Sequence, residues 1–321
     1  MGRKRLIKTL LTLSSALIIT IACMPVNALA AKASYLYSLS NFDGTAPFNW
    51  VRMNVDGATG EVSVADPATQ SVVIFNKFGM QIFDFDTSQF GNVVDFAVDN
   101  EGNFLLLNYQ YPGSRPTLTK CNYRGEFISR TEFKGFPPDM ASGFSPNRLF
   151  FKNSRFYLAS DSKMKIVLTD SNGIFQSGYD LAALIKFDEK MIQSNTGIFG
   201  LTVDNSGRIL FTIPSLFTVF IVSPDGTLTS FGKRGSSPGK FNIASGIAED
   251  DKGNIYVTDK LKCAVIVFDR DYNFKTEFGY RGDNMDNLIV PNDLAVDNNG
   301  KVYVSQLRGR GVSVFAVNLD Q

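Results

Sequence analysis

The sequence predicts an all-β protein, a single six-bladed β-propeller built from four-stranded antiparallel blades. The first observation is the stretch of residues 239–279, which reads as four short β-branched or aromatic strands separated by turn residues. The second is that this unit recurs six times at spacings of 42, 52, 53, 46 and 47 residues, and repeats of this length are typical of propellers and solenoids. The third is that the last copy lacks a fourth strand, which the N-terminal segment can supply.

Each copy is recognised by one residue of the turn before its second strand. These turn residues are Gly60, Gly102, Ser154, Gly207, Gly253 and Gly300. The second strand begins two positions later, and in five of the six copies the third strand follows ten positions after that. The second copy carries a four-residue insertion within residues 108–116. A second Asx-to-Gly turn recurs after the third strand, so most predicted strands are bounded by residues that favour turns.

The ring is predicted to close through its two ends. Residues 311–318 form a third strand with no fourth strand after it, and residues 34–39 form a strand with no blade of its own. We therefore expect the N-terminal strand to complete the sixth blade as its outer edge, which removes an exposed strand edge. Residues 31–321 are then one domain. The only helix-like segment, residues 179–194, is expected to be an insertion between the third and fourth blades.

Residues 1–30 are predicted to be a secretory signal peptide, because a basic head precedes a short apolar run and an Ala-Leu-Ala site. A lipid anchor on Cys23 is the less favoured alternative. Cleavage near Ala30 removes four of the 32 Lys and Arg residues and none of the 31 Asp and Glu, which leaves 28 against 31. This near-equal count of basic and acidic residues, together with the predicted export, argues against a nucleic-acid partner. No membrane span is expected in the mature chain. We expect the protein in the periplasm, at the cell surface or outside the cell.

Histidine is absent from all 321 residues, which excludes imidazole metal ligands, Ser-His-Asp triads and any histidine general base. Propeller enzymes that rely on histidine, such as lyases and quinoprotein dehydrogenases, are excluded with them. The two cysteines of the mature chain, Cys121 and Cys263, fall in different blades on opposite sides of the predicted ring. A disulfide needs Cα atoms within about 7 Å, so we expect none within the chain.

Two segments near the C-terminus carry a family pattern. Residues 238–259 read PGKFNIASGIAEDDKGNIYVTD, and residues 290–305 read VPNDLAVDNNGKVYVS. Both resemble the NHL repeat, whose pattern is Gly-x-Phe, a spacer, Gly-Ile-Ala and then Asp-x-x-Gly-x-Ile-Tyr-Val-x-Asp. The resemblance, to a secreted bacterial-type member, implies one repeat per propeller blade and an interaction scaffold more often than an enzyme. Where the family usually has Asn and Arg after the last Asp, this chain has Lys262 and Ala264, so no ligand contact of those family residues is transferred.

Antiparallel blades sort their connections onto two faces. The Asx-to-Gly turns share one face, called here the turn face, and their aspartates are expected to serve as turn formers. The connectors between blades and the loops between second and third strands share the opposite face, called here the loop face, which is the candidate functional face. Its candidate ligand-binding residues are Lys233, Arg234, Lys260, Lys262, Arg281, Arg308, Arg310, Tyr109, Tyr111 and Trp50. They suit an anionic group or a protein surface, and the alternative is that the cations are ordinary solvated side chains.

A third set of residues is expected at the mouth of the central channel. Seven positions before each turn residue, Asp95, Asn147 and Asp293 supply oxygen atoms, which resembles in type the Ca²⁺ shell of gluconolactonase-like propellers. The alternative is that they cap backbone groups or bind channel water.

The sequence therefore favours an exported, non-enzymatic binding scaffold that presents its loop face to a protein or glycan of the cell envelope and needs no cofactor. The alternative is a Ca²⁺-dependent hydrolase or lactonase with its site at the channel mouth. Fold by itself does not decide between them.

Overall fold

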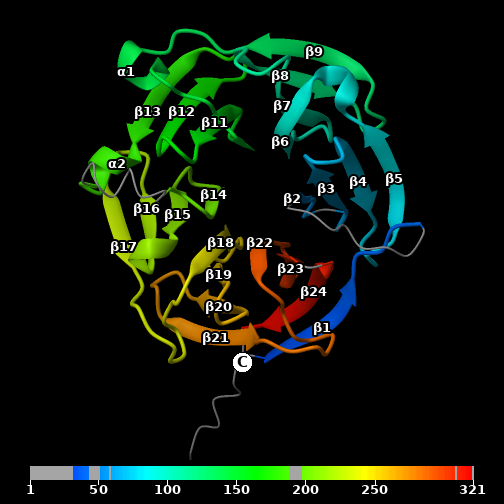
Figure 1. The fold of residues 1–321 in the computed structure, drawn as a ribbon, viewed down its shortest axis with the longest axis vertical. Coiled ribbons are helices and arrows are strands. Elements are labelled where there is room, and N and C mark those ends of the chain that lie inside the picture. Colours follow the sequence, from blue (N-terminus) through cyan, green and yellow to red (C-terminus); the bar gives the residue numbers. More distant parts are fainter. Residues whose placement is uncertain (1–31, 43–50, 58, 188–196, 308, 320–321) are drawn as a thin grey trace, which may run out of the picture.

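The protein is a ring of six four-stranded sheets around a central channel, as predicted (Figure 1). The computed structural model describes residues 32–42, 51–57, 59–187, 197–307 and 309–319. In blades 1 to 5 the strand numbers increase from the channel outwards, and the chain passes from one blade to the next around the ring. The predicted signal peptide lies outside the described residues.

The first three blades follow the chain in order. Blade 1 contains β2 (Arg52–Val55), β3 (Val62–Asp66), β4 (Ser71–Phe75) and β5 (Gln81–Asp86). Blade 2 contains β6 (Asn92–Val98), β7 (Phe104–Tyr109), β8 (Pro116–Cys121) and β9 (Phe127–Glu132). Blade 3 contains β10 (Arg148–Lys152), β11 (Arg155–Ser160), β12 (Lys165–Asp170) and β13 (Phe175–Asp180).

The last three blades complete the ring. Blade 4 contains β14 (Leu201–Val203), β15 (Ile209–Ile213), β16 (Thr218–Val222) and β17 (Leu228–Phe231). Blade 5 contains β18 (Ala244–Glu249), β19 (Ile255–Asp259), β20 (Ala264–Phe268) and β21 (Phe274–Gly279). Blade 6 contains β22 (Pro291–Val296), β23 (Lys301–Gln306), β24 (Gly311–Asn318) and β1 (Lys32–Ser38). The pairing of β1 with β24, from Lys32 opposite Asn318 to Ser38 opposite Ser313, confirms the predicted closure.

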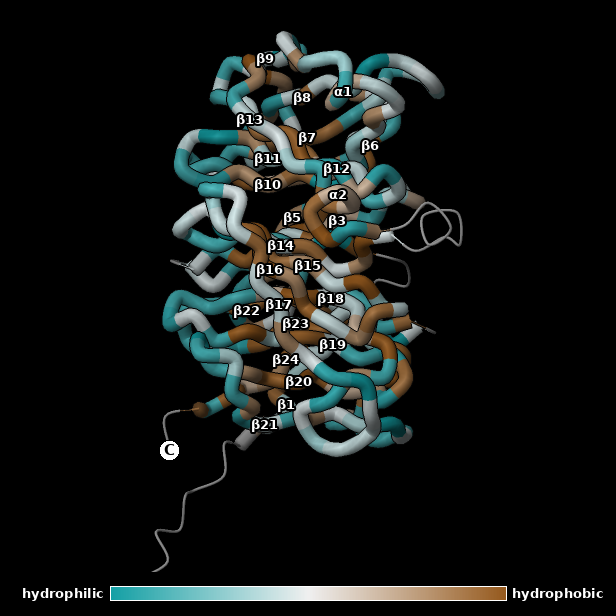
Figure 2. The backbone as a smooth tube through the Cα atoms, turned by 90° about the vertical axis from the view of Figure 1, so that its left-hand side faces the viewer, coloured by the Kyte–Doolittle hydropathy of each residue, from teal (hydrophilic) through white to brown (hydrophobic). Residues whose placement is uncertain are grey.

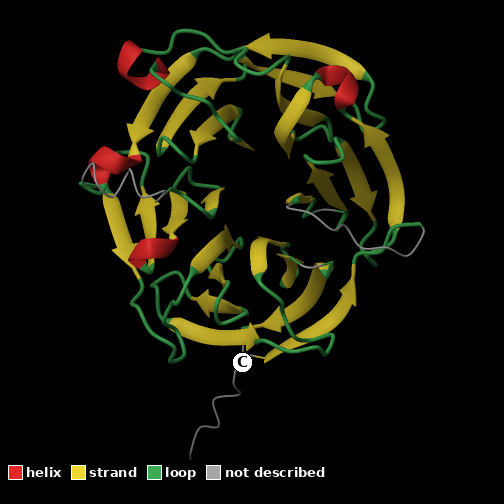
Figure 3. Ribbon diagram, viewed as in Figure 1, coloured by secondary structure: helices red, strands yellow, loops and turns green. Residues whose placement is uncertain are grey.

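Helices are few and lie at the periphery (Figure 3). In the described residues they are two single turns of α-helix, α1 (Pro138–Ala141) and α2 (Leu181–Leu184), and two 3-10 turns at Ser88–Phe90 and Pro214–Leu216. The helix-like segment predicted at residues 179–194 was therefore too long at its start, because Tyr179 and Asp180 belong to β13. The Asp180 carboxylate accepts from the Ala183 amide and caps α2, and residues 188–196 lie outside the described part. No described helix has the length and apolarity needed to span a membrane.

Apolar side chains fill the spaces between neighbouring blades. Phe85 of blade 1 packs edge-on against Phe104 of blade 2 with ring centroids 5.2 Å apart, and Phe231 of blade 4 packs edge-on against Phe268 of blade 5 at 4.9 Å. Figure 2 shows this pattern from the side, with hydrophobic strands inside and hydrophilic turns along both faces. Cys121 and Cys263 are free and buried, as expected from their places in separate blades.

The Asx residues of the turn face act as turn formers, as predicted. In blade 5 one carboxylate oxygen of Asp250 accepts from the amides of Lys252 and Asn254, at 3.0 and 2.8 Å. Gly253 follows with φ +84°, a conformation that favours glycine. Asp99, Asp204 and Asp297 make the same pair of bonds in their own blades.

The innermost strands of blades 4, 5 and 6 approach one another closely. A Cβ atom on Gly246 would lie 2.6 Å from the Cα atom of Asp293, so only glycine fits between β18 and β22. Buried hydroxyl groups link the same blades, because Thr212 of blade 4 donates to the Ser245 carbonyl and Thr258 of blade 5 donates to the Asn292 carbonyl. These contacts fix half of the channel wall at backbone distance.

Replacing Gly246 with Ala tests this close approach. The nearest atoms to the added methyl group belong to the β22 backbone, so we expect the free energy of unfolding to fall by about 1–3 kcal/mol. Urea denaturation measures this change. Ser177→Ala, on the exposed outer strand β13, is the control and should leave the stability unchanged. Equal stability of the two variants would contradict the close packing.

Candidate functional site

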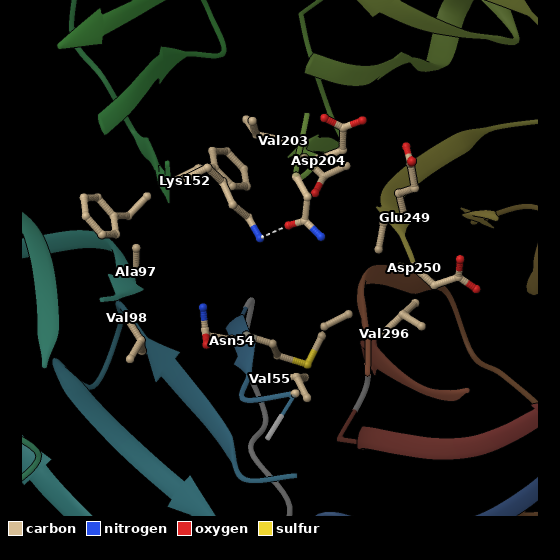
Figure 4. A pocket seen from close by; sticks show the side chains of 18 of the residues that line it. Asn54, Val55, Ala97, Val98, Lys152, Val203, Asp204, Glu249, Asp250 and Val296 are labelled. Atoms are coloured by element: carbon tan, nitrogen blue, oxygen red, sulfur yellow. Dashed lines mark hydrogen bonds between the residues drawn. The ribbon is translucent and has the colours of Figure 1, made fainter. Parts of the chain in front are cut away.

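A cavity with a volume of about 1180 Å³ lies in the central channel. It is lined by the innermost strands β2, β6, β10, β14, β18 and β22 and by the turns that follow them. Residues of the second turn of blade 5, Arg270 and Asp271, also line it, so the cavity opens on the turn face. Figure 4 shows aliphatic side chains on its wall, among them Val55, Val98 and Val296.

Ion pairs across the channel form the inner end of this cavity. Arg52 of blade 1 lies 3.7 Å from Asp95 of blade 2 and 3.5 Å from Asp293 of blade 6. Arg148 of blade 3 lies 3.0 Å from Asp161 and reaches Asp293 at 3.9 Å. These five residues are called here the ion-pair floor. Because they come from blades 1, 2, 3 and 6, the floor joins opposite sides of the ring.

Two side chains of the ion-pair floor are buried. The side chains of Arg148 and Asp95 are 8% and 6% exposed. Arg148 also donates to the Phe199 carbonyl of blade 4 at 2.6 Å, and Asp95 accepts from the Leu149 amide at 2.7 Å. Burial raises the pKa of Asp95 to about 6, although the charges of Arg52 and Arg148 oppose that shift.

The structure places the three predicted metal ligands in this region but surrounds them with cations. Asp95 and Asp293 pair with arginine, and Asn147 exchanges hydrogen bonds with Asp161, donating at 2.9 Å and accepting at 3.0 Å. Among the described residues no three acidic or sulfur-bearing side chains are grouped to hold a metal ion. Because two guanidinium groups neutralise these carboxylates, the set does not fit a Ca²⁺ site.

Sequence counting missed Arg52 and Arg148, which hold the floor together, because the first turns differ in length. In blade 2 the start of the second strand pairs with Val98, four positions before the turn residue Gly102. The equivalent partner lies five positions before the turn residue in blade 1 and three positions before it in blade 3, so the register shifts by one residue in opposite directions. A fixed count of seven positions therefore selects Met53 and Asn147 in place of their arginine neighbours. Arginine at the start of a predicted inner strand was the signal available.

A second charged group lies in the wall of the cavity between blades 4 and 5. Arg208 bonds Asp204 at 2.6 Å and Glu249 at 2.7 Å, and the Glu249 side chain is 7% exposed. Burial raises the pKa of Glu249 to about 7, with Arg208 opposing the shift. The group holds the two blades together along the channel.

Several predicted loop-face residues have structural partners. Lys262 is 6% exposed and pairs with Glu277 at 2.8 Å, and Arg310 donates to the Gly282 carbonyl at 3.1 Å. The Tyr109 hydroxyl donates to the Pro146 carbonyl at 2.8 Å, and burial raises its pKa. These contacts hold loops and connectors in place.

The other predicted loop-face residues are more accessible. Lys233, Arg234, Arg281 and Tyr111 are exposed, and the Arg234 guanidinium lies 4.9 Å over the Phe217 ring. Lys260 is half-buried with its ammonium 3.6 Å over the Phe199 ring, and burial lowers its pKa to about 8. Arg308 and Trp50 lie outside the described residues.

Comparison with known proteins identifies the fold. No family model and no curated protein matches the chain, so the NHL resemblance stays a prediction. A solved structure of virginiamycin B lyase from Staphylococcus aureus, an inactive variant with one histidine replaced by alanine and with quinupristin, is 12% identical, with a TM-score of 0.53 and coverage of 83% of this chain and 80% of that one. At this identity the likeness shows the six-bladed fold alone.

Two structures from Bacteroides are also similar. A protein of unknown function from Bacteroides thetaiotaomicron is 12% identical, with a TM-score of 0.62 and coverage of 90% of this chain and 76% of that one. An auxiliary nutrient binding protein from Bacteroides ovatus is 11% identical, with a TM-score of 0.60 and coverage of 90% and 77%. The fold is thus shared by an enzyme and a binding protein.

Replacing Arg148 with Met tests the ion-pair floor. The variant removes the arginine partner of Asp161 and leaves Asp293 with Arg52 alone, so we expect the free energy of unfolding to fall by about 3–5 kcal/mol. Arg281→Met, at an exposed position, should change it by no more than about 0.5 kcal/mol. Denaturation in urea compares the two variants, and a similar small effect for both would contradict a structural role for the floor.

Replacing Asp95 with Asn tests its burial. The native carboxyl has a pKa of about 6 against an ordinary 3.8, so the folded chain binds this proton more tightly than the unfolded chain. The contribution of Asp95 to the free energy of unfolding therefore falls as the pH rises between these two values, and it is fully lost above the higher one. We expect the difference between wild type and variant to change over that interval and to stay constant above it. Urea denaturation from about pH 4 to about pH 8 measures it, and a constant difference throughout would contradict the assignment.

Proposed function

We propose that this chain is an exported, non-enzymatic binding protein that takes its ligand into the central channel from the turn face. The observation that carries the proposal is the cavity of about 1180 Å³, which is open on that face and ends at the ion-pair floor. Concave sites with a few convergent polar groups are where ligands bind most often. The sequence placed the binding surface on the loop face, whereas the cavity favours the turn face.

The geometry argues against the alternative of a Ca²⁺-dependent hydrolase or lactonase. The carboxylates of Asp95 and Asp293 face Arg52 and Arg148, so they are neutralised before any cation arrives. A lyase with the same fold is described as inactive once a histidine is replaced, and this chain contains no histidine. A binding protein needs neither a Ca²⁺ site nor a catalytic histidine.

Two further considerations favour binding. An auxiliary nutrient binding protein shares the six-bladed fold, and the NHL resemblance implies interaction scaffolds more often than enzymes. Export follows from the signal peptide predicted over residues 1–30, and it brings the protein to ligands or partners of the cell envelope.

The loop face is the second candidate binding surface. Its exposed cations Lys233, Arg234 and Arg281 lie in the connectors that follow blades 4 and 5. The guanidinium of Arg234 rests on the Phe217 ring, which holds it in a defined orientation toward an acidic protein surface.

A bulky side chain in the channel tests the leading proposal. Ala295 of β22 lines the cavity and is half-exposed, so Ala295→Trp fills part of the space that a ligand would occupy. We expect native mass spectrometry, after incubation with the small-molecule fraction of a cell-envelope extract, to detect a retained ligand on wild type and at least tenfold less on the variant. Ser177→Trp, on the exposed face of β13, is the control and should retain the ligand.

Asn54→Trp, on β2 of the neighbouring blade 1, is the second filling variant if Ala295→Trp unfolds. Equal retention by filled and control variants would contradict a channel site. Loss of retention only in the Arg234→Glu/Arg281→Glu variant would move the site to the loop face.

A further inference from the structure

The rim of the channel cavity carries asparagine side chains from four of the six blades. The turns after β6, β10, β14 and β22 place Asn100, Asn153, Asn205 and Asn298 in the lining of the cavity. Blade 5 has Asp251 in the same place, and blade 1 has Gly57. These residues are called here the amide rim.

Part of the amide rim is fixed by bonds between blades. Lys152 of blade 3 donates to the Asn205 side chain at 3.3 Å, an interaction that Figure 4 shows, and that side chain donates to Asp251 at 3.1 Å. Asn298 lies against Gly57, where a Cβ atom would be 2.7 Å from its amide nitrogen. This part of the rim is therefore oriented before any ligand arrives, which lowers the entropy cost of binding.

The rim also has unused bonding capacity. A side-chain amide can donate two hydrogen bonds and accept two. Asn100 is exposed and its side chain makes no hydrogen bond within the described part of the chain. A ligand hydroxyl group also donates and accepts hydrogen bonds, so it can bond to the amide nitrogen and to the amide oxygen of an asparagine side chain.

The charge of the cavity argues against an anionic ligand. Acidic side chains outnumber basic ones in its lining by nine to six. The cations at its inner end, Arg52 and Arg148, are already paired with carboxylates. The acidic excess does not make a cation site either, because Asp99, Asp204 and Asp250 accept backbone amides in their turns.

Between the amide rim and the ion-pair floor the wall is partly apolar. Val55, Val98 and Val296 contribute side chains there. A sugar ring has apolar C–H faces and a hydroxyl edge, which matches an apolar wall below a rim of amides. We propose that the channel binds the end of a neutral oligosaccharide, whose hydroxyl groups bond to the amide rim. This inference rests on the proposed channel site and adds the class of ligand.

The test is isothermal titration of the full mature chain with named oligosaccharides. The neutral probes are maltotriose, cellotriose, mannotriose and N-acetylchitotriose, and the charged probes are trigalacturonate and deacetylated chitotriose. We expect at least one neutral probe to bind, and both charged probes to bind at least tenfold more weakly than that probe. Asn100→Ala should weaken the neutral probe about fivefold, the effect of one hydrogen bond. Asn172→Ala, an exposed turn residue of blade 3 outside the cavity, is the matched control and should have no effect.

The outcomes separate the ligand class from the site. Trigalacturonate or the cationic probe binding as tightly as every neutral probe would overturn the inference. Neutral binding that is unchanged in both Asn100→Ala and Ala295→Trp would also overturn it, because the sugar would then bind elsewhere. If no oligosaccharide binds but Ala295→Trp still loses the ligand retained from the envelope extract, the ligand class is wrong and the channel site stands. If no oligosaccharide binds and the channel variants retain that ligand as wild type does, the ligand class and the channel site are both wrong.

Discussion

A propeller has to hold its innermost strands around one axis, and in this protein buried ion pairs cross that axis. Arg148 reaches from blade 3 to Asp293 on blade 6, and Arg52 bridges Asp293 to Asp95 on blade 2. Charges are costly to bury unless each has a partner, and here every floor arginine meets two carboxylates. The pairing joins blades that share no sheet and gives the channel an inner end.

The two halves of the ring meet the channel differently. Blades 4, 5 and 6 approach at backbone distance, because Gly246 leaves room for Asp293 and the hydroxyl groups of Thr212 and Thr258 bond across the blade boundaries. Blades 1 and 3 instead contribute Arg52 and Arg148, whose long side chains reach carboxylates on other blades.

Counting from turn residues located the region of the site but not its chemistry. The count selected Asp95 and Asp293 correctly as residues of the channel, since the first turns of blades 2 and 6 have the same length. In blades 1 and 3 the register of the first turn shifts by one residue, and the arginines beside the counted positions are the ones that enter the floor. The predicted loop-face residues also differ in their surroundings. Lys262 pairs with a buried carboxylate, whereas Arg234 is exposed.

The sequence by itself determined the number of blades, the order of the strands and the closure by β1, since these depend on local turn chemistry and on alternation of apolar side chains within each repeat. Only the tertiary structure decided which face carries the cavity and which charges neutralise one another. Those features depend on contacts such as Arg148 with Asp293, which lie far apart in the chain and meet only when the ring closes. A shift of one residue in a turn changes such a contact completely while leaving the repeat pattern intact.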